Sequence, residues 1–391
     1  MDFAKSDIQA MLLESADRLL SETSGVEYWR EQRHNALGFD QARWAQFAEL
    51  GWLALPIPEE AGGLNGTIED VALLNIALGK ALANEPYVST VVIANAILKQ
   101  ATNEAQVNAL LGGIAMGTFR VALAHQENGA DPLSICSPAT LARRTSGGFV
   151  LEGAKFMALD APSADQLIVS ASIEGEDGTG LFLVPSQHDG VALEAYALVD
   201  GTRAADVRMT AVSLPADALL IGPNRGADVL REAIDLASIA LMAQAVGAME
   251  AALKICGDYA KERKQFGATI GSFQAIQHIL SDMFIAAHQA RSMLYHALAN
   301  AERPADKRAA ALSAARIVIG EAGQRVSRSG IQVHGGYGLT DEYAIGHYFR
   351  RLMCLEKHFG DLGAHVERFG QSIFVESKQA AVRISLRRIS D

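Results

Sequence analysis

Cysteine, metal-ligand clusters and common catalytic motifs are scarce in this sequence of 391 residues. The three cysteines, Cys136, Cys256 and Cys354, lie far apart and form no C-x-x-C pair, so neither a disulfide framework nor a structural zinc site is indicated. We expect reduced and mostly buried thiols, as in a cytosolic protein. The ten histidines show no spacing typical of metal ligands, and we predict no metal site.

Several motifs with a known mechanism are also missing. The chain has no G-x-G-x-x-G after a predicted strand, no P-loop, no H-E-x-x-H and no G-x-S-x-G. The glycine-rich stretch at Gly335 follows a predicted helix instead of a strand. A nicotinamide-binding fold is therefore not expected.

The chain also has no net positive charge and few long apolar runs. The formal net charge of -11 argues against nucleic acid or an anionic membrane surface as a partner, because both need a basic face. The N-terminal residues include acidic side chains and contain no apolar run of signal-peptide length. No window approaches the roughly twenty apolar residues of a spanning helix. We therefore predict a cytoplasmic protein without a membrane partner.

The sequence that remains divides into helical, strand-like and again helical segments. Apolar spacing predicts helices over 7–20, 39–50, 68–84, 88–100 and 104–111. Short apolar runs separated by Gly, Asp and Ser then predict an antiparallel β domain, and the absence of helices between them argues against a parallel sheet. Helical periodicity returns over 228–263, 272–301, 305–330 and 341–356, as in a four-helix bundle.

The predicted fold class is thus α+β and mostly α. We expect an N-terminal helical domain at 1–117, a middle β-barrel or sandwich domain at 118–222 and a C-terminal four-helix bundle at 223–391. Hydrophobic residues make up 49% of the chain and charged residues 20%, which is enough apolar material for a large core and for subunit contacts.

The most informative stretch is Tyr259 to Met283, which predicts two amphipathic helices interrupted by glycine. Arg263 lies near the end of the first helix and Gln274 in the first turn of the second, so the two side chains could together bind an anion. Guanidinium suits phosphate because its fork of donors matches the oxygens. The alternative is a solvated charge at Arg263 and an ordinary core aromatic at Phe266.

A second segment favours the binding role. Gln332 to Gly338, with the sequence QVHGGYG, places an amide beside a glycine pair that allows close backbone approach to a ligand, and His334 between them is expected to be structural. The motifs R-K-Q-F-G, F-Q and Q-V-H-G-G-Y-G, in this order and spacing, resemble the acyl-CoA dehydrogenase family over essentially the whole chain. The GHYFRRL and FGD segments carry a closer resemblance to small subunits of pimeloyl-CoA-type dehydrogenases.

This resemblance implies an FAD cofactor at a subunit interface. Arg263 and Gln274 would hold the pyrophosphate of an FAD seated mainly in a neighbouring subunit. The resemblance also implies α,β-desaturation of an acyl-CoA in fatty acid or steroid and aromatic catabolism, electron transfer to an electron-transfer flavoprotein, and a tetramer. The remaining residues that it assigns to the cofactor are Gln332, Gly335 and Gly336 at the adenosine, Gln265 and Phe266 beside the arginine, and Gln126 in the flavin-lining loop.

The catalytic carboxylate of the family is missing. A glutamate normally follows the last bundle helix in a Y-E-G-T sequence, which here reads HFGD and places Phe359 at the glutamate position. A minority of relatives carry the glutamate on the first bundle helix, where this chain has Ala237. Glu356 and Asp361 flank the vacancy as weak candidates, and a charged pair on a solvated helix end is the stronger interpretation.

The flavin-lining segments have changed as well. Gln126 replaces the threonine of the family's T-E-P-G-A-G-S loop and Pro132 replaces its serine, while Met157 to Leu159 replace its W-I-T strand. Three explanations remain open: a displaced carboxylate in a self-sufficient homo-oligomer, an alignment shifted by a few residues, or a non-catalytic subunit that completes the FAD site of a homologous catalytic partner in an α2β2 tetramer. The third accounts for most of the pattern. A non-redox acyl-CoA-binding or structural protein is a fourth possibility, against which the retained clamp argues.

Overall fold

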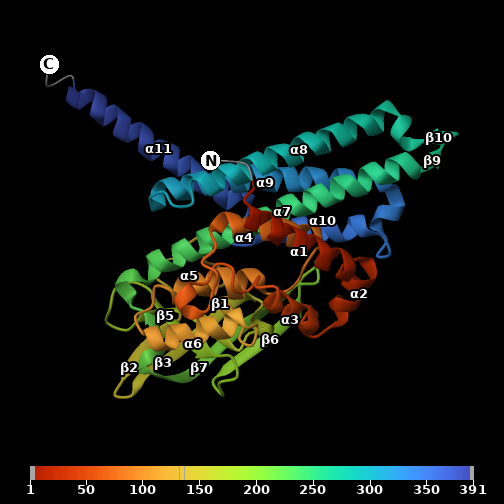
Figure 1. Ribbon diagram of the computed structural model, residues 1–391. Helices are drawn as coiled ribbons and strands as arrows, with labels where there is room; N and C mark the ends of the chain where they lie inside the picture. The colour runs from red at the N-terminus through yellow and green to blue at the C-terminus, as the bar shows by residue number, and fades with distance from the viewer. Residues whose placement is uncertain (1–4, 132, 136, 388–391) are drawn as a thin grey trace.

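The computed structural model describes residues 5–131, 133–135 and 137–387. Its elements follow the predicted order of helices, strands and helices (Figure 1). The first strand begins at Val121 and the first bundle helix at Pro223. The mostly helical α+β architecture is therefore confirmed, while the domain limits at 117 and 222 stay predictions.

The N-terminal helices begin where local capping predicts. Ser6 accepts a hydrogen bond from the Gln9 amide, and the Gln9 side chain accepts one from the Ser6 amide. Thr67 and Asp70 form the same reciprocal box. Such boxes satisfy amides that the first turn leaves without partners. The helices are α1 (Asp7–Thr23), α2 (Val26–His34), α3 (Gln41–Glu49), α4 (Ile68–Lys80), α5 (Ala94–Leu98) and α6 (Glu104–Ala115).

The predicted single helix over 88–100 is wrong in one respect, because its first part has a different hydrogen-bonding period. Val88–Ile93 forms a buried π-helical segment, η2, that continues directly into α5. Such segments are rare and frequently occur at functional sites. From η2, the Ser89 hydroxyl donates to Asp160 Oδ2 at 2.5 Å.

The strands form one eight-stranded sheet whose path runs β6-β7-β3-β2-β4-β5-β8, with β1 paired to β4. Most pairings are antiparallel, but β1·β4 and β2·β4 are parallel. The prediction without parallel pairing is wrong at these two places. Strands β2 and β3 lie in the connection from β1 to β4, and β3 lies in that from β2 to β4, so strands make the crossovers that usually need a helix. The strands are β1 (Val121–Ala124), β2 (Leu141–Thr145), β3 (Gly148–Leu159), β4 (Gln166–Ile173), β5 (Gly180–Pro185), β6 (Val191–Ala197), β7 (Arg203–Pro215) and β8 (Leu219–Ile221).

The C-terminal helices run along the side of the molecule opposite the strands (Figure 1). They include the four predicted helices, and a further helix, α11, projects away from the bundle. A two-stranded hairpin joins the first two helices. The elements are α7 (Pro223–Glu262), β9 (Lys264–Gln265), β10 (Ala268–Thr269), α8 (Gln274–Ala299), α9 (Ala305–His334), α10 (Ala344–Lys357) and α11 (Leu362–Arg387).

Two glycines allow α4 to pack directly on α7. A Cβ on Gly79 would lie 2.0 Å from the Gln244 carbonyl oxygen, and one on Gly247 would lie 2.0 Å from the Ile76 carbonyl oxygen. Both separations are impossible for a real side chain, so only glycine fits. The buried Gln244 amide also donates to Asn75 Oδ1 at 2.9 Å. This crossing fixes the N-terminal helices on the bundle and sets the walls of the cleft described below.

Helix α7 corrects one sequence-based expectation. It contains an 18-residue window that is long and apolar enough to cross a membrane, although no such window was predicted. The window is 78% buried inside the protein, where α4, α8, α9 and α10 pack on the helix. Packing in the protein core therefore buries most of the apolar surface of α7.

Cys256 and Cys354 are free and buried, as predicted. Burial raises the pKa of each thiol to about 12, so both stay protonated at neutral pH. Cys136 and Pro132 lie outside the described residues.

Candidate functional site

The structure places Arg263, Gln265, Phe266 and Gln274 together at one end of the bundle. Arg263 follows the last residue of α7, and its carbonyl accepts a hydrogen bond from the Ile270 amide at 2.8 Å, which closes the β9–β10 hairpin. Gln274 is the first residue of α8. The interruption that the sequence predicted at Gly267 is thus a tight two-residue turn with φ of 53° at Phe266 and 80° at Gly267.

The side chains of this hairpin face outward. Phe266 is 94% exposed, which excludes the interpretation as a core aromatic. Arg263 is exposed, and no described residue forms a hydrogen bond or ion pair with its guanidinium. Gln265 donates to the neighbouring Lys264 carbonyl and to no group beyond the hairpin among the described residues. The donors are therefore free to meet a group outside this chain.

The QVHGGYG segment lies at the same end of the bundle. Tyr259, one turn before Arg263, packs on His334 with ring centroids 4.2 Å apart and stacks on Tyr337 at 6.5 Å. His334 is buried and its Nδ1 contacts the Gly330 carbonyl at 2.8 Å, which agrees with a structural role. The aromatic contacts bring the ends of α7 and α9 side by side.

The glycine pair leaves open space beside these donors. Gly335 has φ of 60° and ψ of -143°, a conformation available almost exclusively to glycine. A Cβ at Gly335 or Gly336 would meet nothing within 4 Å, and Gln332 is exposed on the preceding turn. No described residue packs closely enough to require glycine at position 336. An exposed arginine, several amides and an open glycine surface fit a phosphate-bearing cofactor such as FAD.

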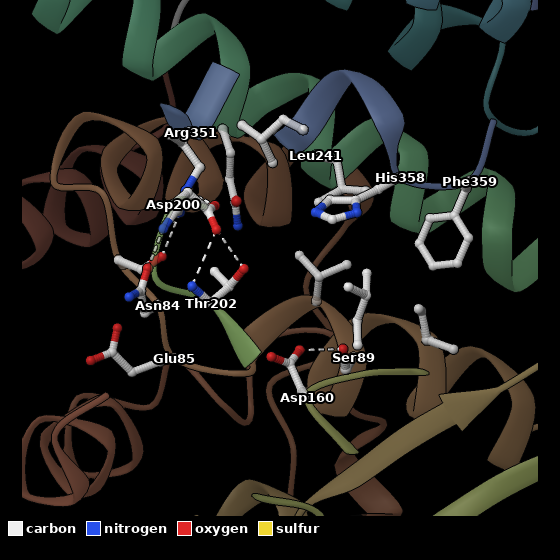
Figure 2. A pocket seen from close by; sticks show the side chains of 16 residues that line it. Asn84, Glu85, Ser89, Asp160, Asp200, Thr202, Leu241, Arg351, His358 and Phe359 are labelled. Atoms are coloured by element: carbon white, nitrogen blue, oxygen red, sulfur yellow. Dashed lines mark hydrogen bonds and ion pairs between the residues drawn. The ribbon is translucent and has the colours of Figure 1, made fainter. Parts of the chain in front are cut away.

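A separate cleft lies between the N-terminal helices, the end of β3 and the α10–α11 connection. It consists of two adjoining cavities that share five lining residues and are partly open to solvent. We call them together the central cleft. Figure 2 shows Asp160 and Ser89 on one wall and His358 with Phe359 on the other. The residues that line both cavities are Ser89, Ile93, Leu159, His358 and Phe359.

Phe359 fills the wall where the family resemblance places the glutamate. It is half-buried, and its φ of 53° is strained for an aromatic residue. The neighbouring His358 is buried, and its Nδ1 has no hydrogen-bond partner among the described residues. Burial lowers the pKa of His358 to about 4, so the ring is neutral at physiological pH.

The two weak carboxylate candidates serve the start of α11 and do not line the central cleft. Glu356 Oε1 accepts from the Leu362 amide at 2.8 Å, and Glu356 Oε2 lies 3.0 Å from Lys357 Nζ. Asp361 Oδ1 accepts from the Ala364 amide at 3.0 Å, and this bond lowers the pKa of Asp361. Both groups are explained as helix-capping and ion-pairing residues.

The loop that contains Gln126 keeps its scaffold but lacks hydroxyl donors toward the central cleft. Glu127 accepts from the Ala139 and Thr140 amides and from Lys155 Nζ at 2.7 Å, which clamps the loop to β3. Gln126 lines the second cavity, and its carbonyl accepts from the Phe156 amide. Leu159 offers no polar side-chain atom. Neither Gln126 nor Leu159 therefore supplies the hydroxyl that the family's flavin-lining segments carry.

Sequence reasoning missed the polar residues of the central cleft. Asp160 directly follows the Met157–Leu159 segment, so its position at the end of that strand was the available signal. Asp200 lies in the β6–β7 turn, where its Oδ2 is 2.7 Å from Arg351 Nε. These two carboxylates come from segments 40 residues apart in sequence, and no local pattern marks their proximity.

Comparison with known proteins agrees with the fold. Models of the acyl-CoA dehydrogenase N-terminal and C-terminal domains match residues 6–118 and 224–373. The probable acyl-CoA dehydrogenase YngJ of Bacillus subtilis is 31% identical over 335 residues, covering 81% of this chain and 86% of that protein. Acyl-CoA dehydrogenase FadE27 of Mycobacterium tuberculosis is 29% identical, with 95% and 99% covered.

One solved structure, the ChsE4-ChsE5 complex from Mycobacterium tuberculosis, superposes with a TM-score of 0.86 at 27% identity, covering 95% of this chain and 99% of that one. The predicted resemblance is thereby confirmed. The chain belongs to the acyl-CoA dehydrogenase family, whose members are FAD-dependent oxidoreductases that act on the CH–CH bond of acyl-CoA thioesters.

Proposed function

We propose that this chain is the partner subunit of a heteromeric acyl-CoA dehydrogenase and supplies the FAD clamp to a homologous catalytic subunit. The observation that carries the proposal is an asymmetry. The exposed clamp around Arg263 is open to a neighbouring molecule, whereas the central cleft has Phe359 and Leu159 in place of the groups that would serve a flavin of its own. The ChsE4-ChsE5 complex is a relative with two different subunits, and it supports the same arrangement here.

In this role each clamp residue has a separate task. The Arg263 guanidinium neutralises and orients the FAD pyrophosphate, and Gln274 donates beside it at the start of α8. Gln332, Gly335 and Gly336 admit the adenosine end, and Gln265 and Phe266 cover the hairpin side. The bound FAD supplies the hydride acceptor for desaturation. The surface that this chain adds excludes water from one side of the cofactor.

The proposal extends to partners and setting. The substrate is an acyl-CoA thioester, and a steroid side chain is the acyl class that we favour, because a similar solved structure is a variant of the Tcur3481-Tcur3483 steroid dehydrogenase pair, with 29% identity and a TM-score of 0.85. Electrons would leave through an electron-transfer flavoprotein. The assembly would be a tetramer in the cytoplasm, with no nucleic-acid or membrane partner.

The direct test compares flavin content in three preparations. The chain is purified alone, a homologous subunit that carries the catalytic glutamate is purified alone, and the two are co-expressed. We expect stoichiometric flavin absorbance in the co-expressed complex and none in this chain alone. Full FAD content in this chain alone would instead support the self-sufficient homo-oligomer, and no FAD in any preparation would support an acyl-CoA-binding or structural protein.

The clamp itself is tested within the complex. Arg263→Ala is expected to lower FAD retention during gel filtration by about 10-fold or more, because a charge-assisted contact to phosphate is lost. Arg263→Lys should restore retention in part, since the charge remains but the fork is absent. Arg303→Ala is the matched control, because Arg303 is exposed beyond the opposite end of α8. Equal FAD content in all variants would remove Arg263 from the clamp.

A further inference from the structure

A cluster of arginines surrounds one carboxylate where α2 meets α10. Asp341 Oδ1 lies 2.8 Å from Arg33 Nη1 and 2.9 Å from Arg350 Nη2, and Asp341 Oδ2 lies 3.6 Å from Arg30 Nε. Arg30 and Arg33 belong to α2, and Arg350 belongs to α10. No other described carboxylate lies within 4 Å of these three guanidiniums. We call the four residues the arginine cluster.

The arginine cluster has an excess of positive charge. Burial opposes ionisation of Asp341, but the nearby Arg33 and Arg350 outweigh it and lower the pKa, so the carboxylate is ionised at neutral pH. Three guanidiniums therefore face a single negative charge. His347 does not change this balance, because burial lowers its pKa and leaves the ring neutral. The excess is local, since the whole chain has a formal net charge of -11.

Packing beneath the arginine cluster fixes the two helices that carry it. The Trp29 ring packs on His347 and Tyr348, with centroids 5.4 and 5.7 Å apart, and the Trp29 indole donates to the Ala81 carbonyl at 2.9 Å. His347 Nε2 contacts the Asp341 carbonyl at 3.1 Å. The backbones of α2 and α10 therefore keep the like charges together, and such an arrangement attracts an anion.

Most hydrogen-bond donors of the arginine cluster remain free. Arg30 forms no hydrogen bond with a described residue, and its contact with Asp341 is longer than a hydrogen bond. Arg33 uses only Nη1, and Arg350 uses only Nη2. The arginine side chains are 45%, 30% and 24% exposed in chain order. Because each guanidinium has five N–H donors in a fork that matches carboxylates, further carboxylates can bind here.

The arginine cluster continues the face that carries the proposed clamp. Two exposed apolar side chains, Tyr337 at 49% and Leu339 at 74%, lie in the chain between the glycine pair of the clamp and Asp341. Tyr343 follows Asp341 and packs on Tyr259, with centroids 5.9 Å apart. Exposed apolar groups bordered by polar ones are typical of a protein interface, whereas a small anion would leave them uncovered.

We propose that the arginine cluster binds an acidic segment of the homologous catalytic subunit and steers that subunit onto the clamp. The inference rests on the proposed function, because its partner is the subunit whose FAD the clamp would hold. Carboxylates of the partner take the free guanidinium donors in charge-assisted hydrogen bonds. The arginine cluster also gives this acidic chain one face that attracts an acidic segment, which raises the association rate and fixes the orientation of the two subunits.

Association kinetics at two salt concentrations test the steering. The catalytic subunit is immobilised, and binding of the FAD-supplemented chain is followed by biolayer interferometry at about 50 and 500 mM NaCl. Arg30→Glu is expected to lower the association rate constant by about 10-fold at the lower salt and by about 2-fold or less at the higher, because salt screens exposed charges. Arg303→Glu, the same charge change beyond the opposite end of α8, should stay within about 2-fold of the wild type at both concentrations.

The substitution at Arg30 should leave the fold intact. Since Arg30 is 45% exposed and has no hydrogen bond to a described residue, Arg30→Glu should shift the thermal midpoint of the isolated chain by about 2 °C or less. Arg30→Gln is the second variant and should show an intermediate association rate, because it removes the charge without reversing it.

A cross-link identifies the occupant. Arg30→Lys in the co-expressed complex supplies an amine, which a carbodiimide joins to a touching carboxylate as an amide. Mass spectrometry should find the peptide of position 30 linked to an aspartate or glutamate of the catalytic subunit, and Arg303→Lys should give no such link. A link only to a second copy of this chain, no link to the catalytic subunit, or equal association rates for Arg30→Glu and the wild type would each overturn the proposal.

These results separate the arginine cluster from the clamp. A complex whose assembly depends on Arg30 but that holds no FAD would support the arginine cluster and contradict the clamp. An FAD-loaded complex whose assembly does not respond to Arg30→Glu would support the clamp and contradict the arginine cluster.

Discussion

Arg351 Nε lies 2.7 Å from Asp200 Oδ2, with the two side chains 4% and 1% exposed. Arg351 also donates to the Ala83 carbonyl at 2.9 Å and to Asn84 Oδ1. One guanidinium therefore joins α10, the β6–β7 turn and the segment after α4. These three segments border the central cleft, so the width of the cleft depends on this ion pair.

Loss of this guanidinium should destabilise the whole chain. Arg351→Met is expected to lower the free energy of unfolding by about 3–5 kcal/mol, because Asp200 would stay buried without its counter-ion. Arg350→Met is the matched control, since its partner Asp341 is 39% exposed and such pairs contribute about 1 kcal/mol or less. Urea denaturation of both variants is the measurement. Equal losses in the two variants would contradict a special role for Arg351.

The Glu127–Lys155 pair predicts a defined loss of stability in acid. Burial alone would raise the pKa of Glu127, but hydrogen bonds from Lys155 and from two backbone amides outweigh it and lower the pKa to about 2. A depressed pKa stabilises the fold above the unfolded value of 4.5, and this contribution disappears as the pH falls toward 2. Glu127→Gln should cost about 2–3 kcal/mol at pH 7.

The same variant should cost progressively less in denaturant titrations at pH 4, 3 and 2.5. Glu152→Gln is the control, because its partner lies 3.8 Å away and both side chains are more than half exposed. A cost for Glu127→Gln that does not change with pH would show that the pair contributes through packing instead of charge.

Much of the fold could be predicted because its signals are local. Capping residues such as Ser6 and Thr67 mark helix starts, and the apolar period marks the long bundle helices. The parallel pairing of β1 with β4 and the π-helical period of η2 could not be predicted. The first depends on which strands meet in space, and the second lies in a fully buried segment where tertiary contacts surround every residue. Neither is a property of a short window of sequence.

The candidate functional residues also divide into those that a sequence motif can point to and those that it cannot. Arg263, Gln274 and the glycines after His334 are adjacent to helix ends, where a motif can identify them. Asp160 accepts a hydrogen bond from η2, and Asp200 pairs with an arginine of α10. Only the folded chain brings these segments together. Sequence patterns therefore singled out the residues of the proposed clamp and missed the polar half of the central cleft.

Phe266 offers a test that separates folding from assembly. Phe266 is 94% exposed in a left-handed turn conformation, and its ring meets Phe273 edge to face with centroids 6.3 Å apart. Phe266→Asn should therefore change the free energy of unfolding of the isolated chain by about 1 kcal/mol or less. In the complex, the same change should weaken FAD retention, because the aromatic cover beside Arg263 is lost. Thermal unfolding of the chain and flavin content of the complex are measured in parallel. A loss of several kcal/mol in the isolated chain would show that the contact with Phe273 is needed for folding, and the flavin result could then not be assigned to assembly.

Asp160 should make a pH-dependent contribution to stability of the opposite sign to that of Glu127. Its folded-state pKa of about 6 exceeds the unfolded value of 3.8, so the folded chain binds the proton more tightly and loses stability as the pH rises from about 4 to 6.

Asp160→Asn keeps a neutral side chain at every pH and keeps the hydrogen bond from Ser89. The variant should therefore exceed the wild type in unfolding free energy by about 1 kcal/mol at pH 8, after allowance for partial solvent exposure, and by little at pH 4. Asp177→Asn, an exposed loop position, should match the wild type at both pH values. If Asp160→Asn were instead less stable at pH 8, the carboxylate would be a structural anchor of the β3 end.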